Sequence, residues 1–592
     1  MIIIPLGGSG ERFKKSGYRM PKPLVKVLGK PIIFWLLDHL GPSKYPIMIP
    51  YHPLLEEYQF EELLRRRYPH IDFRFFKLPI PTNGPVESIL WIFQKSMNIP
   101  DLPVLCLDGD SFYRKNILDL WHHNNSIFYF EDPGNTAEYS FLRCEKDGRI
   151  LEIVEKKRIS HLACTGAYSF ASSRKLKEYS QKLLMDHEGE CYLSMVVQLM
   201  IQDGHPFMSQ KIECQDFQCL GTPFWTKIFS YQNIGHIPDG HFVFDIKCLF
   251  GSFQKPIRTP IMMLIYLYRL GHTISIYLDP KEYSPKLLEE YQIPYNHIVT
   301  RLPDTYTHYF DHANDLEREV GIYPILERQF NHLYDMGDFI KKVSQDLTGE
   351  IYWYTHIPQE IAHLFPKMIS YIRTNEQDEI VLEKINGVPV SNLWIYQELT
   401  IEQFQKLLET LSQIHQVKID GEKQSIYQNY QPKIISRRRG YNYLKFPEDE
   451  HIFPSILEKL EEYQKGDYGI ISVVHGDPVF TNIILDRIRL KFIDMRGRLG
   501  ETPSILGDQL YDWAKIYQSL TGYDEIMYQK YVSSDYKRNF VGHFKKYFIT
   551  KYGERRWYYL HYLTASLYYS LIPLHNDEKC SDYYNIISRL LI

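Results

Sequence analysis

A short polar loop in the C-terminal part of the chain limits the possible folds more than any other segment. It reads His475-Gly476-Asp477-Pro478-Val479-Phe480-Thr481-Asn482, and Asp494 follows twelve residues later, after an apolar stretch. Four residues separate Asp477 from Asn482, and this spacing, with a second aspartate further on, is typical of loops that transfer a phosphoryl group. We therefore predict that Asp477 accepts or orients the proton of an acceptor hydroxyl, while Asn482 and Asp494 hold Mg²⁺ on the phosphates of ATP.

A different phosphate-binding motif lies at the other end of the chain. The apolar run Ile2–Leu6 predicts a buried parallel strand, and it leads into the glycine-rich segment Gly7–Gly10. Glycines at such a turn let backbone N–H groups approach a triphosphate, and Arg12 and Lys22 can neutralise its charge. With 592 residues the chain is too long for one core, so we assign the two motifs to separate domains.

The overall charge argues against a broad polyanion-binding role. The chain has 68 Lys and Arg residues against 72 Asp and Glu residues, which gives a net charge of -4. No global field favours nucleic acid or an anionic membrane, and we predict neither as a partner.

The sequence also predicts a soluble, cytoplasmic protein. Its eight cysteines include no close pair of the Cys-x-x-Cys type, which fits a reducing compartment better than a disulfide framework or a zinc site. The first residues lack the basic start and long apolar centre of a signal peptide, and the best apolar run, Ile261–Tyr268, ends at Arg269, far short of a membrane span. We expect small-molecule partners, and self-association into a homo-oligomer stays open.

The N-terminal motif resembles the sugar-nucleotide pyrophosphorylase family of nucleotidyltransferases. In that family a glycine-rich loop is followed by P-K-P-L and G-K-P segments, a base-recognition loop, a strand ending in a magnesium-binding aspartate, acceptor-site segments and a G-T-P turn. This chain carries similar features in the same order up to about residue 230. The matching segments are Leu6–Phe13, Pro21–Leu24, Gly29–Ile32, Thr82–Glu87, Val104–Asp110, Ile153–Lys157, Thr165–Phe170 and Leu220–Pro223.

That resemblance implies a role for each matching segment. The loop and Arg12 would hold the nucleoside triphosphate, Lys22 would stabilise charge on the α-phosphoryl group during transfer, and Asp110 would hold Mg²⁺. An incoming phosphate monoester is already a competent nucleophile, so positioning and electrostatics suffice. The resemblance further implies a nucleotide-binding set of Leu6, Gly7, Gly8, Gly10, Asn83 and Gly84, and an acceptor-binding set of Lys156, Thr165 and Gly166.

One position departs from the family pattern. Many relatives place a second metal-binding aspartate just before the G-T-P turn, where this chain has Phe217-Gln218-Cys219-Leu220. Asp216 is nearby, and the sequence leaves open whether it binds a metal or lies at the surface.

The middle of the chain resembles the haloacid-dehalogenase (HAD) phosphatase superfamily. A predicted strand ends at Asp245, and a helical run, a second strand at His272–Leu278 and Asp311 follow in that family's order. Asp245 would correspond to the nucleophile that forms an aspartyl-phosphate. Lys247 occupies the position of the acid-base aspartate, so nothing would protonate the leaving oxygen, and Lys247 could instead pair with Asp245. We therefore predict an inactive, structural domain in which Asp245 and Asp311 are remnants.

The C-terminal region resembles the aminoglycoside phosphotransferase and choline kinase family, which shares the protein-kinase fold. The strand lysine that contacts the ATP phosphates would be Lys341 or Lys342, because a strand alternates faces and only one of them can point into the cleft. Glu350 would be its partner on a helix. Glu383 would lie at the adenine site, in the strand and hinge Ile380–Gly387.

Other features of this region are assigned to structure. Thr400–Gln416 has apolar residues at a helical period and predicts a helix with one buried face, with His415 used in packing. His475 would hold the catalytic loop and Asp512 would buttress it. The basic run Arg437–Arg439 predicts a solvated face and is left out of the site.

These patterns predict an α/β multidomain protein. A Rossmann-like (GT-A-like) nucleotidyltransferase domain would cover residues 1–232, a degenerate HAD-like α/β domain residues 233–328, and a bilobal α+β kinase-like domain residues 329–592.

The two sites together predict a bifunctional enzyme. The kinase-like domain would phosphorylate a small alcohol or sugar with ATP, and the N-terminal domain would couple that phosphate to a second nucleoside triphosphate and release pyrophosphate. Such pairing resembles choline activation, and related nucleotidyltransferases supply precursors for capsules and other surface glycans. We favour CTP, because these families usually activate non-sugar alcohols with it; a sugar with UTP or GTP is the other option.

A second hypothesis is NDP-sugar synthesis with a regulatory, non-catalytic kinase-like domain. The intact Asp477, Asn482 and Asp494 argue against it, because a pseudokinase commonly loses one of these residues.

Overall fold

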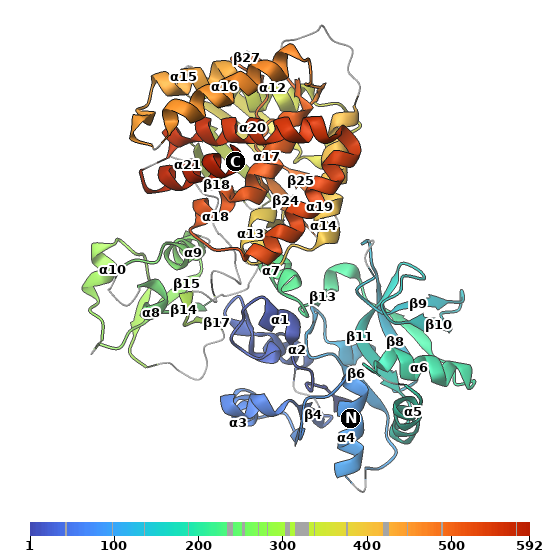
Figure 1. The fold of residues 1–592 in the computed structure, drawn as a ribbon. Coiled ribbons are helices and arrows are strands. Elements are labelled where there is room, and N and C mark those ends of the chain that lie inside the picture. Colours follow the sequence, from blue (N-terminus) through green and yellow to red (C-terminus); the bar gives the residue numbers. More distant parts are fainter. Residues whose placement is uncertain are drawn as a thin grey trace. The chain divides into compact units, whose positions relative to one another are not determined.

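The chain divides into two compact units, Met1–Pro324 and Ile325–Ile592 (Figure 1). The computed structural model describes all residues except 42–43, 97–98, 135–136, 188, 234–240, 251–254, 270, 281, 302–307, 314–315, 317–330, 337, 375–376, 418–425, 447, 487–488, 576 and 592. The segment predicted as the first domain, residues 1–232, thus shares one unit with residues 233–324 of the predicted second domain. The predicted boundary between residues 328 and 329 falls outside the described residues.

The first unit is built on a nine-stranded mixed sheet. β1 (Ile2–Ile3) lies between β4 (Ile47–Tyr51) and β6 (Val104–Leu107) and is parallel to both, and β5 (Phe73–Lys77) continues the parallel half beyond β4. β11 (Leu162–Phe170) pairs with β6 in the antiparallel direction. The remaining strands are β8 (Ser126–Glu131), β9 (Phe141–Cys144), β10 (Ile150–Val154) and β12 (Met208–Lys211).

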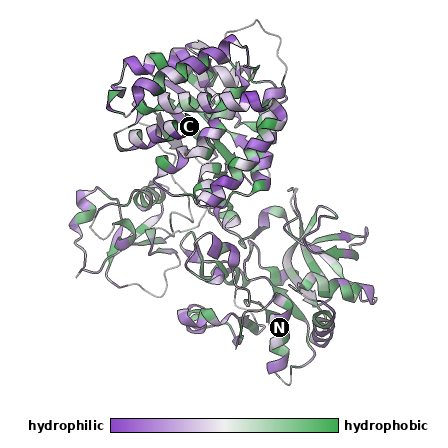
Figure 2. Cartoon of the chain, viewed as in Figure 1, coloured by the Kyte–Doolittle hydropathy of each residue, from purple (hydrophilic) through white to green (hydrophobic). Residues whose placement is uncertain are grey.

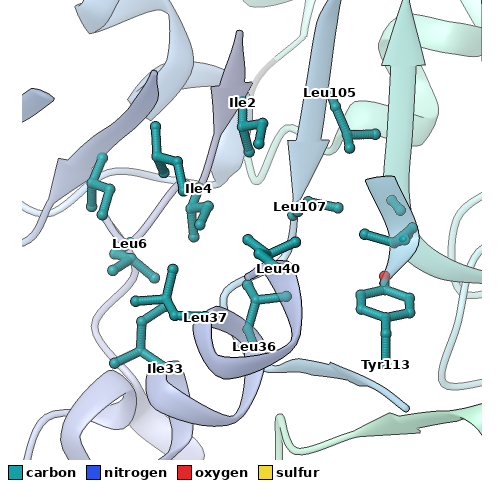
Figure 3. Packing of buried hydrophobic residues seen from close by; sticks show 14 of the residues in the cluster. Ile2, Ile4, Leu6, Ile33, Leu36, Leu37, Leu40, Leu105, Leu107 and Tyr113 are labelled. Atoms are coloured by element: carbon teal, nitrogen blue, oxygen red, sulfur yellow. The ribbon is translucent and has the colours of Figure 1, made fainter. Parts of the chain in front are cut away.

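The predicted buried strand at the start of the chain is confirmed. Ile2 and Ile4 pack on one face of the sheet against α2 (Ile32–Leu40), as Figure 3 shows. Ile3 packs on the other face with residues of α4 (Pro85–Lys95), because successive side chains of a strand point to opposite faces. α2 supplies Ile33, Leu36, Leu37 and Leu40, which the helical period places on one face.

The functional loops of this unit leave the sheet at the ends of β1 and β6. The glycine-rich segment follows β1 and enters α1 (Glu11–Lys15), while Asp108–Asp110 follows β6. Because β1 and β6 are parallel, their carboxyl ends lie at the same edge of the sheet. Open α/β sheets bind their ligands at this edge. The N-terminal domain therefore has the predicted Rossmann-like arrangement.

The middle of the chain forms a four-stranded parallel sheet in the order β16-β15-β14-β17. Its hydrophobic residues do not form a separate core: Phe242 and Phe310 belong to the same cluster as Phe13, Val27 and Trp35 of the N-terminal domain. The predicted strands are confirmed. Their hydrophobic residues pack against the N-terminal segment that carries Lys22. The bounds are β14 (His241–Asp245), β15 (Thr273–Tyr277), β16 (His297–Val299) and β17 (His308–Phe310), with α9 (Arg258–Arg269) between β14 and β15.

The second unit begins with a four-stranded antiparallel sheet in the order β18-β19-β21-β20. α12 (Thr348–His356) follows β19 directly in the chain. The polar loop His475–Asn482 lies further on, between β23 (Ile471–Val473) and β24 (Ile483–Leu485), and Asp494 follows β25 (Leu490–Phe492). The strands of the sheet are β18 (Asn331–Asp335), β19 (Phe339–Ser344), β20 (Met368–Arg373) and β21 (Asp378–Glu383).

Helices make up most of the rest of the second unit. The predicted helix is confirmed as α14 (Ile401–Gln416), whose N-terminus carries a capping box formed by Thr400 and Gln403. Hydrophilic and hydrophobic residues alternate along these helices in Figure 2, as expected where one face is buried. No helix among the described residues is long and apolar enough to cross a membrane. The others are α15 (Gln431–Arg439), α16 (Asp449–Lys465), α17 (Gln509–Thr521), α18 (Tyr523–Tyr528), α19 (Ser534–Tyr552), α20 (Glu554–Leu571) and α21 (Asp577–Leu591).

Candidate active sites

A cavity of about 660 Å³ opens at the carboxyl edge of the first sheet. Apart from Asp216, whose role the sequence leaves open, every N-terminal residue that the sequence singles out for binding or chemistry lines the cavity. These residues come from segments far apart in the chain. They are Leu6, Gly7, Gly8, Gly10, Arg12, Lys22, Asn83, Gly84, Asp110, Lys156, Thr165 and Gly166.

Two glycines allow the nucleotide-binding loops to approach each other closely. A Cβ on Gly7 would overlap the hydroxyls of Thr82 and Ser88, and the Gly7 carbonyl accepts a hydrogen bond of 3.2 Å from the Thr82 N–H. Gly84 has a φ of 115°, and a Cβ there would overlap the carbonyl of Cys191. A side chain at Gly7 would force the glycine-rich loop and the predicted base-recognition loop apart, and one at Gly84 would force the base-recognition loop away from Cys191.

Lys22 and Asp110 form the charged centre of the cavity. Lys22 Nζ lies 2.5 Å from Asp110 Oδ2. Burial alone lowers the pKa of Lys22, but the adjacent Asp110 carboxylate outweighs burial, so the pKa is raised and the lysine stays charged. A permanent positive charge at this point can offset negative charge that develops on a phosphoryl group.

Asp108 is a second carboxylate at this centre that the sequence analysis missed. Burial, followed by repulsion from Asp110, raises the pKa of Asp108 to about 8. The sequence signal was its place two residues before Asp110 at the end of the same strand. Hard cations such as Mg²⁺ prefer carboxylate oxygens, so Asp108 and Asp110 together fit such an ion.

Two more glycines leave room for these carboxylates. A Cβ on Gly166, whose φ is 80°, would overlap Oδ2 of Asp108, and a Cβ on Gly221 would overlap Oδ2 of Asp110. The Asp108 N–H also donates a hydrogen bond of 2.9 Å to the Gly166 carbonyl. The segments Thr165–Gly166 and Gly221–Pro223 therefore set the position of the acidic pair.

Asp216, the candidate for a second metal ligand, is engaged elsewhere. Its Oδ2 lies 2.6 Å from Lys115 Nζ, and it is not among the residues that line the cavity. Cys219 does line the cavity, where its Sγ accepts a hydrogen bond of 3.3 Å from the Gly221 N–H. The second carboxylate beside Asp110 is thus Asp108.

Glu155 and Lys156 also line the cavity. Ser194 donates a hydrogen bond of 2.6 Å to Glu155 Oε2, which also accepts from Ser140. Lys156 has a left-handed φ of 48° and places its Nζ 4.2 Å from the ring centroid of Tyr192, whose hydroxyl it also contacts. Glu155 lies in the predicted acceptor-site segment Ile153–Lys157 but had no assigned role, and Tyr192 was not predicted from the sequence.

The two predicted remnants of the middle segment, Asp245 and Asp311, both form local polar contacts. Asp245 accepts hydrogen bonds from the Tyr309 hydroxyl and the Lys247 N–H, each 2.9 Å long. Asp311 pairs at 2.8 Å with Lys26. The Lys247 side chain pairs at 2.6 Å with Glu282, so the expected ion pair between Lys247 and Asp245 is wrong. The inactivity of this segment stays a prediction.

In the second unit, the structure distinguishes the two candidate lysines. Lys342 Nζ lies 2.6 Å from Glu350 Oε2 and 2.8 Å from Asp494 Oδ1, and these carboxylates raise its pKa although burial opposes them. Lys341 points to the other face of β19 and pairs at 2.7 Å with Glu379. Lys342 is therefore the lysine beside Asp494, and Glu350 is its helix partner on α12.

The Asp512 carboxylate holds the backbone of the loop that carries Asp477. The Asp512 carboxylate accepts the N–H groups of His475 and Gly476 at 2.9 and 2.8 Å, and His415 Nε2 lies 3.0 Å away. The Asp477 N–H donates to His475 Nδ1 at 3.1 Å, and burial lowers the pKa of His475. The structure thus gives His475, His415 and Asp512 the packing and supporting contacts that were predicted.

Asp477 and Asn482 contact each other within this loop. Asn482 Nδ2 donates to the Asp477 carbonyl at 2.9 Å, and Lys515 Nζ lies 3.0 Å from Asp477 Oδ1. The amide oxygen of Asn482 and the carboxylate of Asp494, whose φ is 60°, are suitable Mg²⁺ donors. Among the described residues, no group of three or more His, Cys, Asp or Glu side chains forms a metal cluster.

Glu383, predicted to lie at the adenine site, ends β21. Its carboxylate accepts the Lys367 N–H at 3.0 Å, and its own N–H donates to the Lys367 carbonyl at 2.9 Å. These two bonds join the end of β21 to the residue before β20.

The comparisons with known proteins concern the first unit. Residues 1–226 match the family model of the nucleotidyl transferases. Curated relatives include the bifunctional protein GlmU of Methanocaldococcus jannaschii, 20% identical over 203 residues, and that of Methanococcus maripaludis, 22% identical over 208 residues. Each match covers 34% of this chain and 47% of the relative, so the chain spans about half the length of the curated relatives it matches.

Similar solved structures also align with only part of the chain. A nucleoside-diphosphate-sugar pyrophosphorylase from Vibrio cholerae is 21% identical, with a TM-score of 0.35, over 39% of this chain and 98% of its own. The inositol-1-phosphate CTP transferase from T. maritima is 13% identical, with a TM-score of 0.29, over 36% of this chain and 85% of its own. From the family match, the N-terminal domain is a nucleotidyl transferase domain.

Proposed function

We propose that the protein is a bifunctional enzyme that builds an activated alcohol in two steps. In the second unit, a small alcohol or sugar receives the γ-phosphoryl group of ATP. In the first unit, the resulting phosphate attacks the α-phosphorus of a second nucleoside triphosphate, for which we favour CTP, and pyrophosphate leaves. The product is a nucleoside diphosphate-linked alcohol, a precursor suited to the synthesis of capsule or another surface glycan.

The acidic pair beside Lys22 is the observation that most supports nucleotidyl transfer. A phosphate oxygen of the acceptor forms the new bond to the α-phosphorus, while the bond from that phosphorus to the bridging oxygen breaks. Lys22 and Arg12 provide positive charge for the phosphoryl oxygens, and Asp108 and Asp110 would hold Mg²⁺, which supplies further charge stabilisation when bound. No general base is needed, because the attacking phosphate is already ionised.

Lys342, Glu350, Asp494 and Asp477 support phosphoryl transfer in the second unit. Lys342 would contact the ATP phosphates, with Glu350 fixing its position. Asp494 and Asn482 would hold Mg²⁺, and Asp477 would take the proton of the acceptor hydroxyl as its oxygen attacks the γ-phosphorus. The favourable contact between Lys342 and both carboxylates supports a catalytic rather than a purely regulatory second unit.

Two variants test whether each unit carries out one of the two reactions. The protein is incubated with ATP, each other nucleoside triphosphate and a panel of alcohols, while ADP and pyrophosphate are followed separately. We expect Asp477→Asn to abolish ADP formation but to leave pyrophosphate release from a supplied phospho-alcohol. Asp110→Asn should abolish pyrophosphate release but leave ADP formation intact.

The outcomes separate the proposals. If Asp477→Asn leaves substrate-dependent ADP formation intact, the kinase assignment is wrong. If the wild-type protein releases pyrophosphate from sugar phosphates but never forms ADP with any alcohol, the second unit is regulatory and the protein makes an NDP-sugar. An Asp110→Asn variant with unchanged pyrophosphate release would overturn the first site.

A further inference from the structure

A cluster of three cationic side chains surrounds Tyr511 next to Asp477. Lys433, on α15, places its Nζ 3.2 Å from the Tyr511 hydroxyl, and Arg496, just after Asp494, places its Nη1 2.8 Å from the same oxygen. Lys515, one turn along α17 from Tyr511, pairs with Asp477. Three separate segments therefore direct positive charge to one place beside the catalytic loop.

Positive charge is in excess in this cluster. Within the described part of the chain, neither Lys433 nor Arg496 has a carboxylate within ion-pair distance, and Asp477 is paired with Lys515. Burial lowers the pKa of Lys433 to about 8, and the charges of Arg496 and Lys515 add to this effect. Collecting like charges in a partly buried place is costly unless an anion offsets them.

The contacts of the Tyr511 hydroxyl show which donor groups such an anion would meet. Its oxygen accepts hydrogen bonds from Lys433 and from Arg496, and their charges, with that of Lys515, lower the pKa of Tyr511 to about 8 although burial opposes them. The Tyr511 side chain is itself buried, so it supplies an oxygen acceptor at the base of the cluster. A guanidinium and two ammonium groups are well suited to a carboxylate or phosphate.

We propose that Lys433, Arg496 and Lys515 bind an anionic group of the acceptor alcohol, so that the substrate of the second unit is a hydroxy acid or an alcohol that already carries a phosphate. This inference rests on the proposed phosphotransferase function. The cluster adjoins Asp477, which would take the proton of the acceptor hydroxyl, and the lysine that pairs with Asp494 is a different one, Lys342. The anion therefore belongs to the acceptor and not to ATP.

The backbone places Arg496 firmly at this point. Its N–H donates a hydrogen bond of 3.0 Å to the His475 carbonyl, and a Cβ on Gly476 would overlap the Cβ of Arg496. The cationic cluster and the catalytic loop are thus parts of one rigid arrangement. In the reaction, the acceptor oxygen bonds to the γ-phosphorus, the bond to the ADP oxygen breaks, and the hydroxyl proton passes to Asp477; the anionic group is unchanged.

The test compares matched alcohols that differ in charge. ADP formation is measured with glycerate and glycerol, with gluconate and glucitol, and with glycerol 1-phosphate, for the wild type and for Lys433→Met. We expect kcat/KM to be at least about tenfold higher for the anionic member of a productive pair. Lys433→Met should raise the acceptor KM about tenfold or more and leave the ATP KM unchanged, whereas Lys433→Arg should retain activity.

A charge control comes from the same helix. Arg439 lies at the exposed end of α15. The substitution Arg439→Gln removes one positive charge from this helix but none from the cluster. This variant should behave like the wild type. Preference for glycerol, glucitol or a cationic alcohol would overturn the anion subsite while leaving the phosphotransferase intact, and so would a rise in the ATP KM instead of the acceptor KM.

A binding measurement decides the question if no alcohol yields ADP. That result would remove the proposed phosphotransferase function, but inorganic phosphate can still be titrated into the full-length protein. We expect Lys433→Met to weaken phosphate binding about tenfold or more relative to Arg439→Gln. Equal binding by the two variants would show that the cluster is not an anion site.

Discussion

Lys341 and Lys342 are neighbours on β19, yet their side chains have different surroundings. The Lys342 side chain is 8% exposed between Glu350 and Asp494, whereas that of Lys341 is 32% exposed beside Glu379. A strand alternates its faces, so the sequence predicts that only one lysine faces the cleft but not which one. That choice depends on how β19 pairs with β18 and β21, which is a tertiary property.

Paired substitutions test this difference. Lys342→Met should lower ADP formation by at least about 100-fold, and it should lower the free energy of unfolding by about 3–5 kcal/mol, because it leaves the buried Glu350 uncompensated. Lys341→Met removes a more exposed ion pair and should cost at most about 1 kcal/mol. Rate assays and urea unfolding measure both effects. Greater loss of activity in Lys341→Met would show that the assignment is reversed.

A buried carboxyl group gives a prediction about pH. Burial raises the pKa of Asp524 to about 7. Because the folded pKa is above that of the unfolded chain, the protonated group stabilises the fold at low pH, and this contribution is lost as pH rises from about 4 to about 7. Asp524→Asn should therefore be more stable than the wild type at pH 8, by on the order of 2–4 kcal/mol, and the difference should shrink at pH 4.

Unfolding by urea at the two pH values measures this effect. The exposed Asp535 of α19 serves as a control, and Asp535→Asn should show no such pH dependence. An equal stability difference between Asp524→Asn and the wild type at pH 4 and pH 8 would contradict the prediction.

At the scale of elements, a glycine within strand β11 leaves room for the acidic pair that follows β6. Gly166 and Gly204 both have left-handed φ values, 80° and 84°, but a Cβ at Gly166 would overlap Asp108 while a Cβ at Gly204 meets open space. Gly→Ala therefore adds a similar backbone strain of about 1–2 kcal/mol at each position. Only Gly166→Ala should also displace Asp108 and lower pyrophosphate release, by about tenfold or more. The same loss of activity in Gly204→Ala would show that strain alone is responsible.

Sequence patterns predicted elements better than side-chain partners. The runs Ile2–Leu6 and Thr400–Gln416 predicted a strand and a helix, which the structure has as β1 and α14, because burial imposes a period on the sequence. The role of Asp108 was missed and that of Asp216 was left open, because only the three-dimensional arrangement shows that Asp216 pairs with Lys115. The cationic cluster was also invisible, since Lys433, Arg496 and Lys515 lie on three separate segments.

At the scale of the whole molecule, each unit has its own candidate site. The predicted division at residues 232 and 233 does not separate two hydrophobic cores, because Phe242 and Phe310 pack with Phe13 and Trp35. Sequence motifs mark chemistry, but they do not show whether a segment buries its apolar surface alone or against a neighbour. The middle segment is thus part of the structural support of the nucleotidyl transferase domain.

The fate of the γ-phosphate of ATP tests the two-step account most directly. The protein is given ATP labelled with ³²P at the γ position, unlabelled CTP and the alcohol panel used for the charge comparison. We expect the label in the phosphate that joins the alcohol to the nucleotide product, and none in pyrophosphate, because that phosphate is made in the second unit and used in the first. A nucleotide product that forms without the label, or that forms equally well without ATP, would contradict the account.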